Sequence, residues 1–363
     1  TEQYSSDSMS VENRAQSELL VNSIWKTVLE GSSNARNLSV EVLNQYADDL
    51  LYFDYPNELK EKGMIDEVCY RNDFLLKVES RMGVSSPVFV KYKDYLNEVK
   101  GSEVSKMLMA GDKIAVVFAE GDIDNGTNEG IRSDKFETML WDIADDELIR
   151  AVVLRVNSPG GSAYGAEQIW RALQCVRTNK PVIVSMGDYA ASGGYYISTA
   201  ANYIVANPST ITGSIGVFSV IPNLDSLSKK IGVSLETVKT NENSDFGTSI
   251  MTPLSDDMKQ KMQEHTERVY DIFLQRCADG RGLSIDSVKS LAEGRVWSGQ
   301  SAYELGLVDR LGTLDDAIQL ASEKAGLSDI TTINMTDLNN IKVVYQGRIT
   351  LELGKTDGDR LSR

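Results

Sequence analysis

The sequence predicts an α/β fold with a mostly parallel sheet, and three observations support this prediction. Short runs rich in β-branched apolar residues occur at positions 114–118, 149–156, 181–185 and 203–206. Stretches with helical periodicity lie between them at 133–144, 163–176 and 191–201. Two of the strands lead into turns made of small residues. Strands that alternate with helices are typical of a parallel sheet covered by helices.

The rest of the chain divides around this α/β region. Residues 1–83 have helical patterns, and 84–112 form a connector with one strand-like run at 88–92. The complete α/β unit is predicted to occupy 113–327, with Ser133 as the N-cap of its first helix. Beyond residue 328 the pattern fades, so 328–363 is predicted to be an extension that ends in a frayed tail.

Composition excludes several classes of function. A formal net charge of −16 over 363 residues argues against binding to nucleic acid or to an acidic lipid surface. Cys69, Cys175 and Cys277 lie too far apart for a disulfide framework or a metal motif, so we expect buried thiols. No stretch is long and apolar enough to span a bilayer, and the first residues have no signal-peptide pattern. The single histidine, His265, restricts the choice of general base.

A partial internal repeat runs through the chain. Leu38 and Leu283 lie in similar segments 245 positions apart, as do Trp25 and Tyr270. Residues 61–68 match 304–311 at an offset of 243. Matches in the same order at nearly one offset indicate a duplication rather than unrelated helical hairpins. Residues 1–83 would then be the final third of a first copy, and the sequence would be part of a larger protein.

Two turns carry the chemistry that the sequence suggests. In the turn at 157–161, Pro159 fixes the chain and two glycines let backbone N–H groups approach a ligand. Ser192 follows the strand at 181–185, opens a helix, and precedes Gly193. Acyl transfer needs a nucleophile and donors for an oxyanion, and sheets of this type bind ligands at their strand ends. The alternatives are a simple tight turn and a serine that only caps its helix.

A third turn, at 210–216, is rich in hydroxyl groups and contains Ser214. Together these segments resemble the signal peptide peptidase A (SppA) family of membrane-associated bacterial serine proteases. The resemblance covers nearly the whole chain. It is densest at 153–161, 185–187 and 190–195, and it continues at 201–216 and 294–299. The repeat resembles that of the long, two-copy members, with the front of the first copy missing. The fold implied is the one shared by the Clp protease and crotonase groups.

The resemblance implies a role for each of four residues. Ser192 matches the nucleophile, Gly161 and Gly193 match the backbone donors of the oxyanion hole, and Ser214 matches a serine that hydrogen-bonds the catalytic base. The implied base is a lysine that forms a Ser-Lys dyad. No cofactor and no metal are implied.

The lysine is missing from the positions that the family offers. In short members it lies downstream of the serine, at a position that corresponds here to Ser244, where there is no lysine. In long members it comes from the first copy, and the alignment places it just upstream of Thr1. The substitutes in this sequence are weaker: we expect Lys239 at a solvated strand end, Lys229 and Lys230 on a solvated helix, and His265 on a polar helix face.

The sequence therefore predicts a serine endopeptidase that acts through an acyl-enzyme at Ser192, with little activity in this chain alone. Asp188 is predicted to be a turn residue rather than a triad acid. The resemblance implies peptide substrates such as signal-peptide remnants and unfolded chains. It also implies a homo-oligomer in the bacterial cell envelope, attached to the inner membrane through segments outside this chain. Two alternatives remain, a crotonase-type acyl-CoA enzyme and a catalytically silent scaffold.

Overall fold

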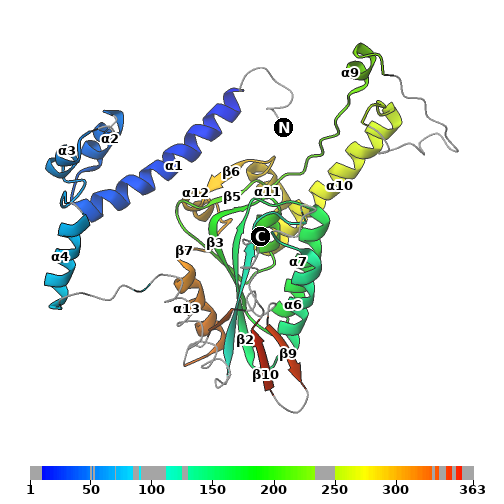
Figure 1. The fold of residues 1–363 in the computed structure, drawn as a ribbon. Helices are drawn as coiled ribbons and strands as arrows, with labels where there is room; N and C mark the ends of the chain where they lie inside the picture. Colours follow the sequence, from blue (N-terminus) through cyan, green and yellow to red (C-terminus); the bar gives the residue numbers. More distant parts are fainter. Residues whose placement is uncertain are drawn as a thin grey trace, which may run out of the picture.

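The centre of the molecule is a twisted sheet with helices on both faces (Figure 1). In it, β1 (Lys113–Glu120), β2 (Ile149–Ser158) and β3 (Val182–Ala191) run parallel, side by side. A computed structural model describes residues 10–49, 51, 54–69, 71–84, 90, 112–124, 130–233, 250–328, 332–334, 341–345 and 349–353. The predicted α/β fold with a mostly parallel sheet is confirmed.

Strand β3 is longer than predicted and has a different neighbour along each half. Its first half pairs with β4 (Tyr203–Ala206), and its second half pairs with β5 (Ile211–Gly213). The sequence prediction ended this strand at Ser185, because the residues that follow are small and resemble a loop. Pairing with β5 keeps them extended as far as Ala191, so Ser192 emerges at the carboxyl edge of the sheet.

The outer strands complete the sheet. β6 (Val296–Ser298) pairs antiparallel with β5, and β7 (Arg310–Leu311) pairs parallel with β4. β8 (Thr332–Asn334) pairs parallel with β1, beyond the predicted end of the α/β unit at residue 327. Farther along the chain, β9 (Ile341–Tyr345) and β10 (Ile349–Leu353) form an antiparallel pair where the sequence pattern suggested only an extension.

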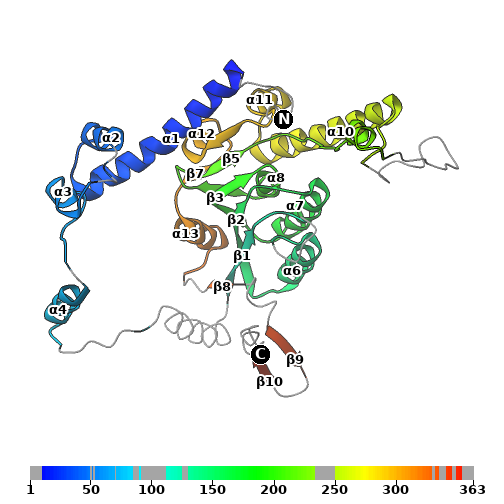
Figure 2. The same ribbon diagram turned by 45° about the horizontal axis from the view of Figure 1, so that its top comes forward.

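Helices pack on both faces of the sheet (Figure 2). One face is covered by α6 (Ser133–Asp145), α7 (Ala163–Arg177), α8 (Gly193–Ser198) and the second half of α10 (Asp256–Arg281). The opposite face is covered by α13 (Leu314–Ala325). Alternate residues of β1 follow this division, because Ala115 and Val117 join the first core and Ile114 and Val116 join the second. Two further helices, α11 (Ile285–Leu291) and α12 (Gly299–Glu304), flank β6.

The N-cap predicted for α6 is wrong. Arg132 occupies the N-cap position, and Ser133 is the first helical residue. The carboxylate of Asp124 does the capping instead, because it accepts hydrogen bonds from both the backbone N–H and the hydroxyl of Ser133. Helix α7 begins and ends within one residue of its predicted bounds, whereas α8 is shorter than predicted.

The N-terminal region is helical, as predicted, and extends to one side of the sheet (Figure 2). It contains α1 (Val11–Arg36), α2 (Val40–Asp48), α3 (Pro56–Glu61) and α4 (Arg71–Met82). Helix α1 reaches the α/β unit at β6, where the hydroxyl oxygens of Ser23 and Ser298 lie 2.5 Å apart. Helices α1 and α10 each have 26 residues, and their serine N-caps, Ser10 and Ser255, are 245 positions apart.

Three minor predictions have mixed outcomes. Cys277 is buried as predicted and Cys175 is half-buried, but Cys69 is exposed, so that part of the prediction is wrong. Within the described residues no helix is long and apolar enough to cross a membrane. The strand-like run at 88–92, apart from Val90, and the tail at 357–363 lie outside the described residues.

Candidate active site

Ser192 sits between the end of β3 and the start of α8, in a backbone conformation that is rare for a residue with a side chain. Its φ is 52° and its ψ is −120°. The Ser192 N–H donates to the carbonyl of Gly213 at 2.9 Å, and its own carbonyl accepts from the Tyr196 N–H at 2.8 Å. The side chain makes no capping hydrogen bond. The alternative role of a helix-capping serine therefore does not apply in this structure.

The glycine turn after β2 lies directly against this serine. A Cβ atom at Gly160 would lie 2.7 Å from the Gly193 nitrogen and 2.8 Å from the Ser192 Cβ. A Cβ atom at Gly161 would lie 2.3 Å from the carbonyl oxygen of Ile123. The φ values of 108° at Gly160 and 145° at Gly161 also favour glycine. The two turns thus meet only because neither of these glycines has a side chain.

The structure brings together three of the predicted residues: Ser192, Gly161 and Gly193. Gly193 is the first residue of α8, a position whose N–H has no partner within a helix. In the part of the chain that the structure describes, the N–H groups of Gly161 and Gly193 donate to no acceptor. A Cβ atom at Gly193 would lie 3.3 Å from the Gly161 nitrogen, so the two turns present these amides close to one another.

A cavity of about 490 Å³ opens beside these groups. Ser192, Ser214, Gly160, Gly161 and Gly193 all line it. Much of the remaining lining is apolar and comes from α7, α8, α10 and the segment after β5: Ala163, Ala166, Tyr196, Val217, Phe218, Val269 and Phe273. Asp122 and His265 also line the cavity, so it is its apolar part that favours an apolar group near the serine hydroxyl.

Ser214, the fourth predicted residue, also lies at this cavity. It follows β5 with a φ of 48°, and its N–H donates to the carbonyl of Arg295 at 2.7 Å. In the same turn, Thr212 donates its hydroxyl to the carbonyl of Ala190, which ties β5 to β3. The Thr212 hydroxyl therefore stabilises the pairing of β5 with β3, while Ser214 lies at the cavity.

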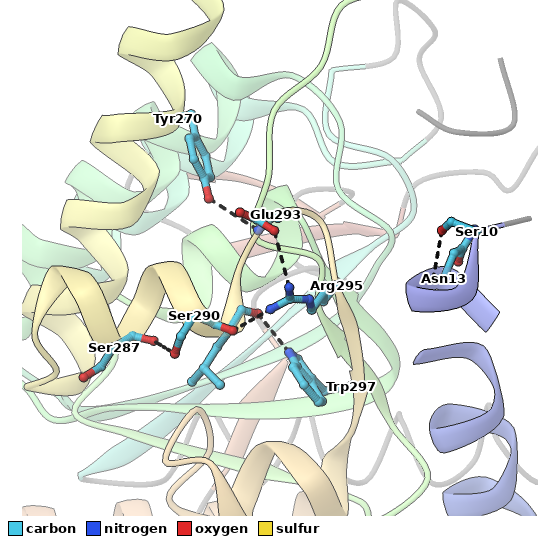
Figure 3. A network of polar contacts seen from close by, with 9 residues as sticks. Ser10, Asn13, Tyr270, Ser287, Ser290, Glu293, Arg295 and Trp297 are labelled. Carbon is cyan, nitrogen blue, oxygen red and sulfur yellow. Dashed lines mark hydrogen bonds and ion pairs between the residues drawn. The ribbon is translucent and has the colours of Figure 1, made fainter. Parts of the chain in front are cut away.

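Residues 293–297 lie beside the Ser214 turn, because the Ser214 N–H donates to the Arg295 carbonyl. Figure 3 shows the polar contacts that hold these residues. The Glu293 N–H donates to the hydroxyl of Tyr270 at 3.3 Å, and Arg295 Nη1 donates to the carbonyl of Ser290 at 2.6 Å. Trp297 Nε1 donates to the carbonyl of Leu291 at 3.1 Å. A second cavity, of about 390 Å³, runs from Ser192 and Ser214 past Tyr270 and Glu293. The space beside the serine thus continues along α10.

The other titratable residues considered as a catalytic acid or base differ in where they lie relative to the cavity. Asp188 is exposed within β3 rather than in a turn, so that prediction is wrong, and it does not line the cavity. Lys229 and Lys230 are exposed at the end of α9 (Asp225–Lys230), as predicted. His265 is exposed, as predicted, but it also lines the cavity. Lys239 lies outside the described residues.

One lysine, Lys180, is buried, but it is remote from Ser192. Burial lowers the pKa of its ammonium group. Its Nζ donates to the carbonyls of Ile143 and Asp146, the latter at 2.6 Å. Lys180 precedes the amino end of β3, whereas Ser192 follows the carboxyl end of this ten-residue strand. Among the described residues, no lysine lines the cavity, and no cluster of side chains suits a metal ion.

Sequence reasoning missed the wall of the cavity that α10 supplies. His265, Val269 and Phe273 recur every four residues and line the cavity together. This spacing marks one face of a helix and was a readable signal. What the sequence did not reveal is that this face of α10 lies opposite Ser192.

An ion pair fixes this wall in place. Arg276 Nη2 on α10 lies 2.6 Å from Glu167 Oε1 on α7, and the Arg276 guanidinium stacks 3.8 Å from the centre of the Trp170 ring. Glu167 also accepts the hydroxyl hydrogen of Tyr196 on α8. The Tyr196 and Phe273 rings pack with their centroids 4.9 Å apart. Three helices are thereby locked around the cavity.

The fold and the site define an α/β protein in which a serine and two backbone amides face a partly apolar cavity. The model of peptidase family S49 matches residues 174–328. A relative from Synechocystis sp. is 37% identical over 215 residues, which are 59% of this chain and 75% of that protein. The chain belongs to peptidase family S49, the SppA family of proteases.

Longer relatives match most of the chain. "Protease 4" of Haemophilus influenzae is 35% identical over 89% of this chain and 54% of its own length. "Serine protease SPPA, chloroplastic" of Arabidopsis thaliana is 30% identical over 93% of this chain and 51% of its own length. The chain thus spans about half the length of these curated relatives. Among solved structures, a ClpP1 mutant from Listeria monocytogenes is similar with a TM-score of 0.39 and 14% identity, over 56% of this chain and 93% of that one.

Proposed function

We propose that this protein is a serine peptidase that cleaves peptides through an acyl-enzyme at Ser192. The observation that carries the proposal is the backbone of Ser192, held at φ 52° with a hydroxyl that caps nothing and lines a cavity. Strained backbone of this kind clusters at functional sites. A serine that served only the fold would have no need of it.

In the proposed reaction, the Ser192 oxygen attacks the carbonyl carbon of the scissile peptide while a base removes the hydroxyl proton. The carbonyl oxygen becomes an oxyanion, and the Gly161 and Gly193 N–H groups donate to it. The tetrahedral intermediate collapses when the C–N bond breaks and the protonated base gives its proton to the leaving amine. Water then adds to the acyl-enzyme by the same route and releases Ser192.

We propose that the base is a lysine outside the described residues, and that Ser214 hydrogen-bonds it. The arrangement of the cavity supports this, because His265 is the single basic side chain that lines it within the part of the chain described. A lysine serves as base only where burial lowers its pKa toward neutrality. The apolar lining beside Ser192 and Ser214 provides such surroundings.

The proposed substrates are extended peptides with an apolar or small side chain next to the scissile bond. The apolar lining from Val217, Val269 and Phe273 supports this choice. A relative from Enterococcus faecium carries the name of an SppA signal peptide peptidase, which agrees with membrane-derived peptides as substrates. We also propose a homo-oligomer in the bacterial cell envelope, with membrane attachment through other segments.

We further propose that α1 to α4 are the end of a first copy of the α/β unit. The caps of α1 and α10 support this, since Asn37 and Gly282 both end their helices with φ near 60° and lie 245 positions apart. The next helices, α2 and α11, have serine N-caps, Ser39 and Ser284, at the same offset. The N-cap serines and the C-cap residues with positive φ thus all recur at one offset. Helices of independent origin would not be expected to share this spacing.

The proposed reaction is tested by labelling with a fluorophosphonate and by a peptide-cleavage assay. We expect the probe to attach to Ser192, as mapped by mass spectrometry, in a protein that includes the sequence upstream of Thr1. We expect this chain alone to cleave peptides weakly. Labelling at another residue contradicts the proposal. Binding of CoA thioesters without peptide cleavage would favour the crotonase-type alternative, and inertness in every assay would favour the scaffold.

The identity of the base is tested by the pH dependence of kcat/KM and by two substitutions. A base acts when deprotonated, so kcat/KM rises as pH increases through its pKa. We expect His265→Ala and Lys239→Ala to leave kcat/KM and this profile unchanged in the active protein, because the base is another lysine. If His265→Ala abolishes a rise centred near the ordinary histidine pKa of about 6.5, histidine is the base and the Ser-Lys assignment is wrong.

A further inference from the structure

A short segment after β1, Gly121 to Asp124, runs beside the glycine turn that contributes Gly161. The Ile123 N–H donates to the Gly160 carbonyl at 2.8 Å, and the Ser162 N–H donates to the Ile123 carbonyl at 2.9 Å. These two bonds hold the peptide groups on either side of Gly161. The orientation of the Gly161 N–H therefore depends on the position of the Ile123 backbone.

The next residue, Asp124, holds this segment in an unusual conformation. Its φ is 46°, a left-handed value that aspartate tolerates better than most residues. Its N–H donates to the Ile131 carbonyl at 2.9 Å. Its Oδ1 accepts from the Ser133 N–H at 2.9 Å, and its Oδ2 accepts from the Ser133 hydroxyl at 2.5 Å. The carboxylate thus ties the segment to the first turn of α6.

The first turn of α7 closes the other side of the same carboxylate. A Cβ atom at Gly165 would lie 2.2 Å from Asp124 Oδ2 and 3.0 Å from a side-chain carbon of Ile123. Ser162, whose N–H donates to the Ile123 carbonyl, is also the N-cap of α7, and its side-chain oxygen accepts from the Gly165 N–H at 3.1 Å. The carboxylate is therefore seated between the beginnings of α6 and α7, one residue from Ile123.

We propose that Asp124 is a positioning residue that aligns the Gly161 N–H with the oxyanion. It does not touch the substrate, and it acts through Ile123 and the glycine turn. This inference rests on the proposed acyl transfer at Ser192. Without the carboxylate, the left-handed turn at Asp124 keeps its backbone bond to Ile131 but loses both contacts with Ser133. Ile123 then shifts, and the Gly161 N–H, which is the proposed donor to the oxyanion, shifts with it.

The test compares Asp124→Ala with Asp124→Asn in a preparation that hydrolyses peptides. An asparagine keeps both contacts, because its oxygen accepts from the Ser133 N–H and its amide donates to the Ser133 hydroxyl. We expect Asp124→Ala to lower kcat by about tenfold to hundredfold, as misplacement of a reacting group does, with KM little changed. We expect Asp124→Asn to restore kcat. The rate of phosphonylation of Ser192 should follow kcat, since the phosphoryl oxygen needs the same donors.

Asp134→Ala is the matched control, since it removes an exposed carboxylate from the same first turn of α6. Asp134 pairs with Arg132 at 2.5 Å and lies outside the cavity lining. We expect it to leave kcat unchanged. Gly165→Ala is the independent variant, because its new methyl group displaces the Asp124 carboxylate from the α7 side. We expect the same loss of kcat there, and this variant stands in if Asp124→Ala does not fold.

Three outcomes overturn the inference while leaving the proposed function intact, provided that Ser192→Ala is inactive. The first is a normal kcat in Asp124→Ala. The second is an equal loss in Asp124→Asn and Asp124→Ala, which would exclude the two contacts with Ser133 as the cause. The third is a normal kcat in Gly165→Ala. An active Ser192→Ala variant, in contrast, contradicts the proposed function itself, whatever Asp124 does.

Discussion

Replacing Ser192 by alanine is expected to abolish peptide hydrolysis and leave the fold intact. Loss of a serine nucleophile costs about 10⁶-fold in kcat, because the remaining groups cannot form an acyl-enzyme. Within the described residues the Ser192 hydroxyl makes no hydrogen bond to protein, so its removal leaves no buried group without a partner. An alanine adopts the same left-handed backbone at a similar cost, since both residues carry a Cβ.

The measurement is kcat on a peptide substrate together with the thermal unfolding midpoint. Ser287→Ala is the matched control, because Ser287 is an exposed hydroxyl on α11 that lines neither cavity at the site. We expect the control to keep full activity and both variants to unfold at the temperature of the unchanged protein. Substantial turnover by Ser192→Ala would place the chemistry elsewhere. A large drop in its unfolding midpoint would make the lost activity uninformative.

The sequence was sufficient for the fold class, and it also selected residues that the structure brings together at one cavity, Ser192, Gly161 and Gly193 among them. Both results depend on local signals. β-branched runs such as 149–156 mark buried strands wherever they occur. The glycine at 161 marks a backbone that no other residue adopts with ease, and Ser192 follows a strand at the start of a helix. Because the strands are parallel, their carboxyl ends meet at one edge, and the two turns meet with them.

What the sequence could not provide depends on contacts between distant residues. The second half of β3 is extended because Tyr189, Ala190 and Ala191 pair with β5, about twenty residues onward. Ser133 has a capping sequence signal, yet Asp124 takes the capping role through a turn that no periodicity describes. The face of α10 that contains Val269 reads as amphipathic, but its position opposite Ser192 follows from the packing of Phe273 against Tyr196. Local patterns therefore predicted candidate site residues but not the helix faces that line the cavity around them.

Replacing Gly161 by alanine is expected to produce the second large loss, without removing any functional side chain. The new methyl carbon would lie 2.3 Å from the Ile123 carbonyl oxygen, 2.7 Å from its nitrogen and 3.0 Å from its carbonyl carbon. These are backbone atoms, which cannot rotate away as the end of a flexible side chain can. The glycine turn must therefore move away from the Gly121–Asp124 segment. Its φ of 145° is also unfavourable for alanine. The Gly161 N–H then no longer points at the oxyanion, and loss of one such donor costs about 10²- to 10³-fold in kcat.

Gly306→Ala is the control that separates the cost of a positive φ in alanine from the loss of kcat caused by displacement of the Gly161 N–H. Gly306 also has a positive φ, of 77°, but a Cβ atom there meets nothing within 4 Å, and the residue lies away from the cavity. We expect Gly306→Ala to lower the unfolding midpoint with normal kcat, and Gly161→Ala to lower kcat at saturating substrate in the molecules that remain folded. Active-site titration with a fluorophosphonate gives the folded, competent fraction needed for this comparison. If Gly161→Ala retains normal kcat per titrated site, the Gly161 amide is not an oxyanion donor. Gly193 would then have to stabilise the oxyanion with a different partner.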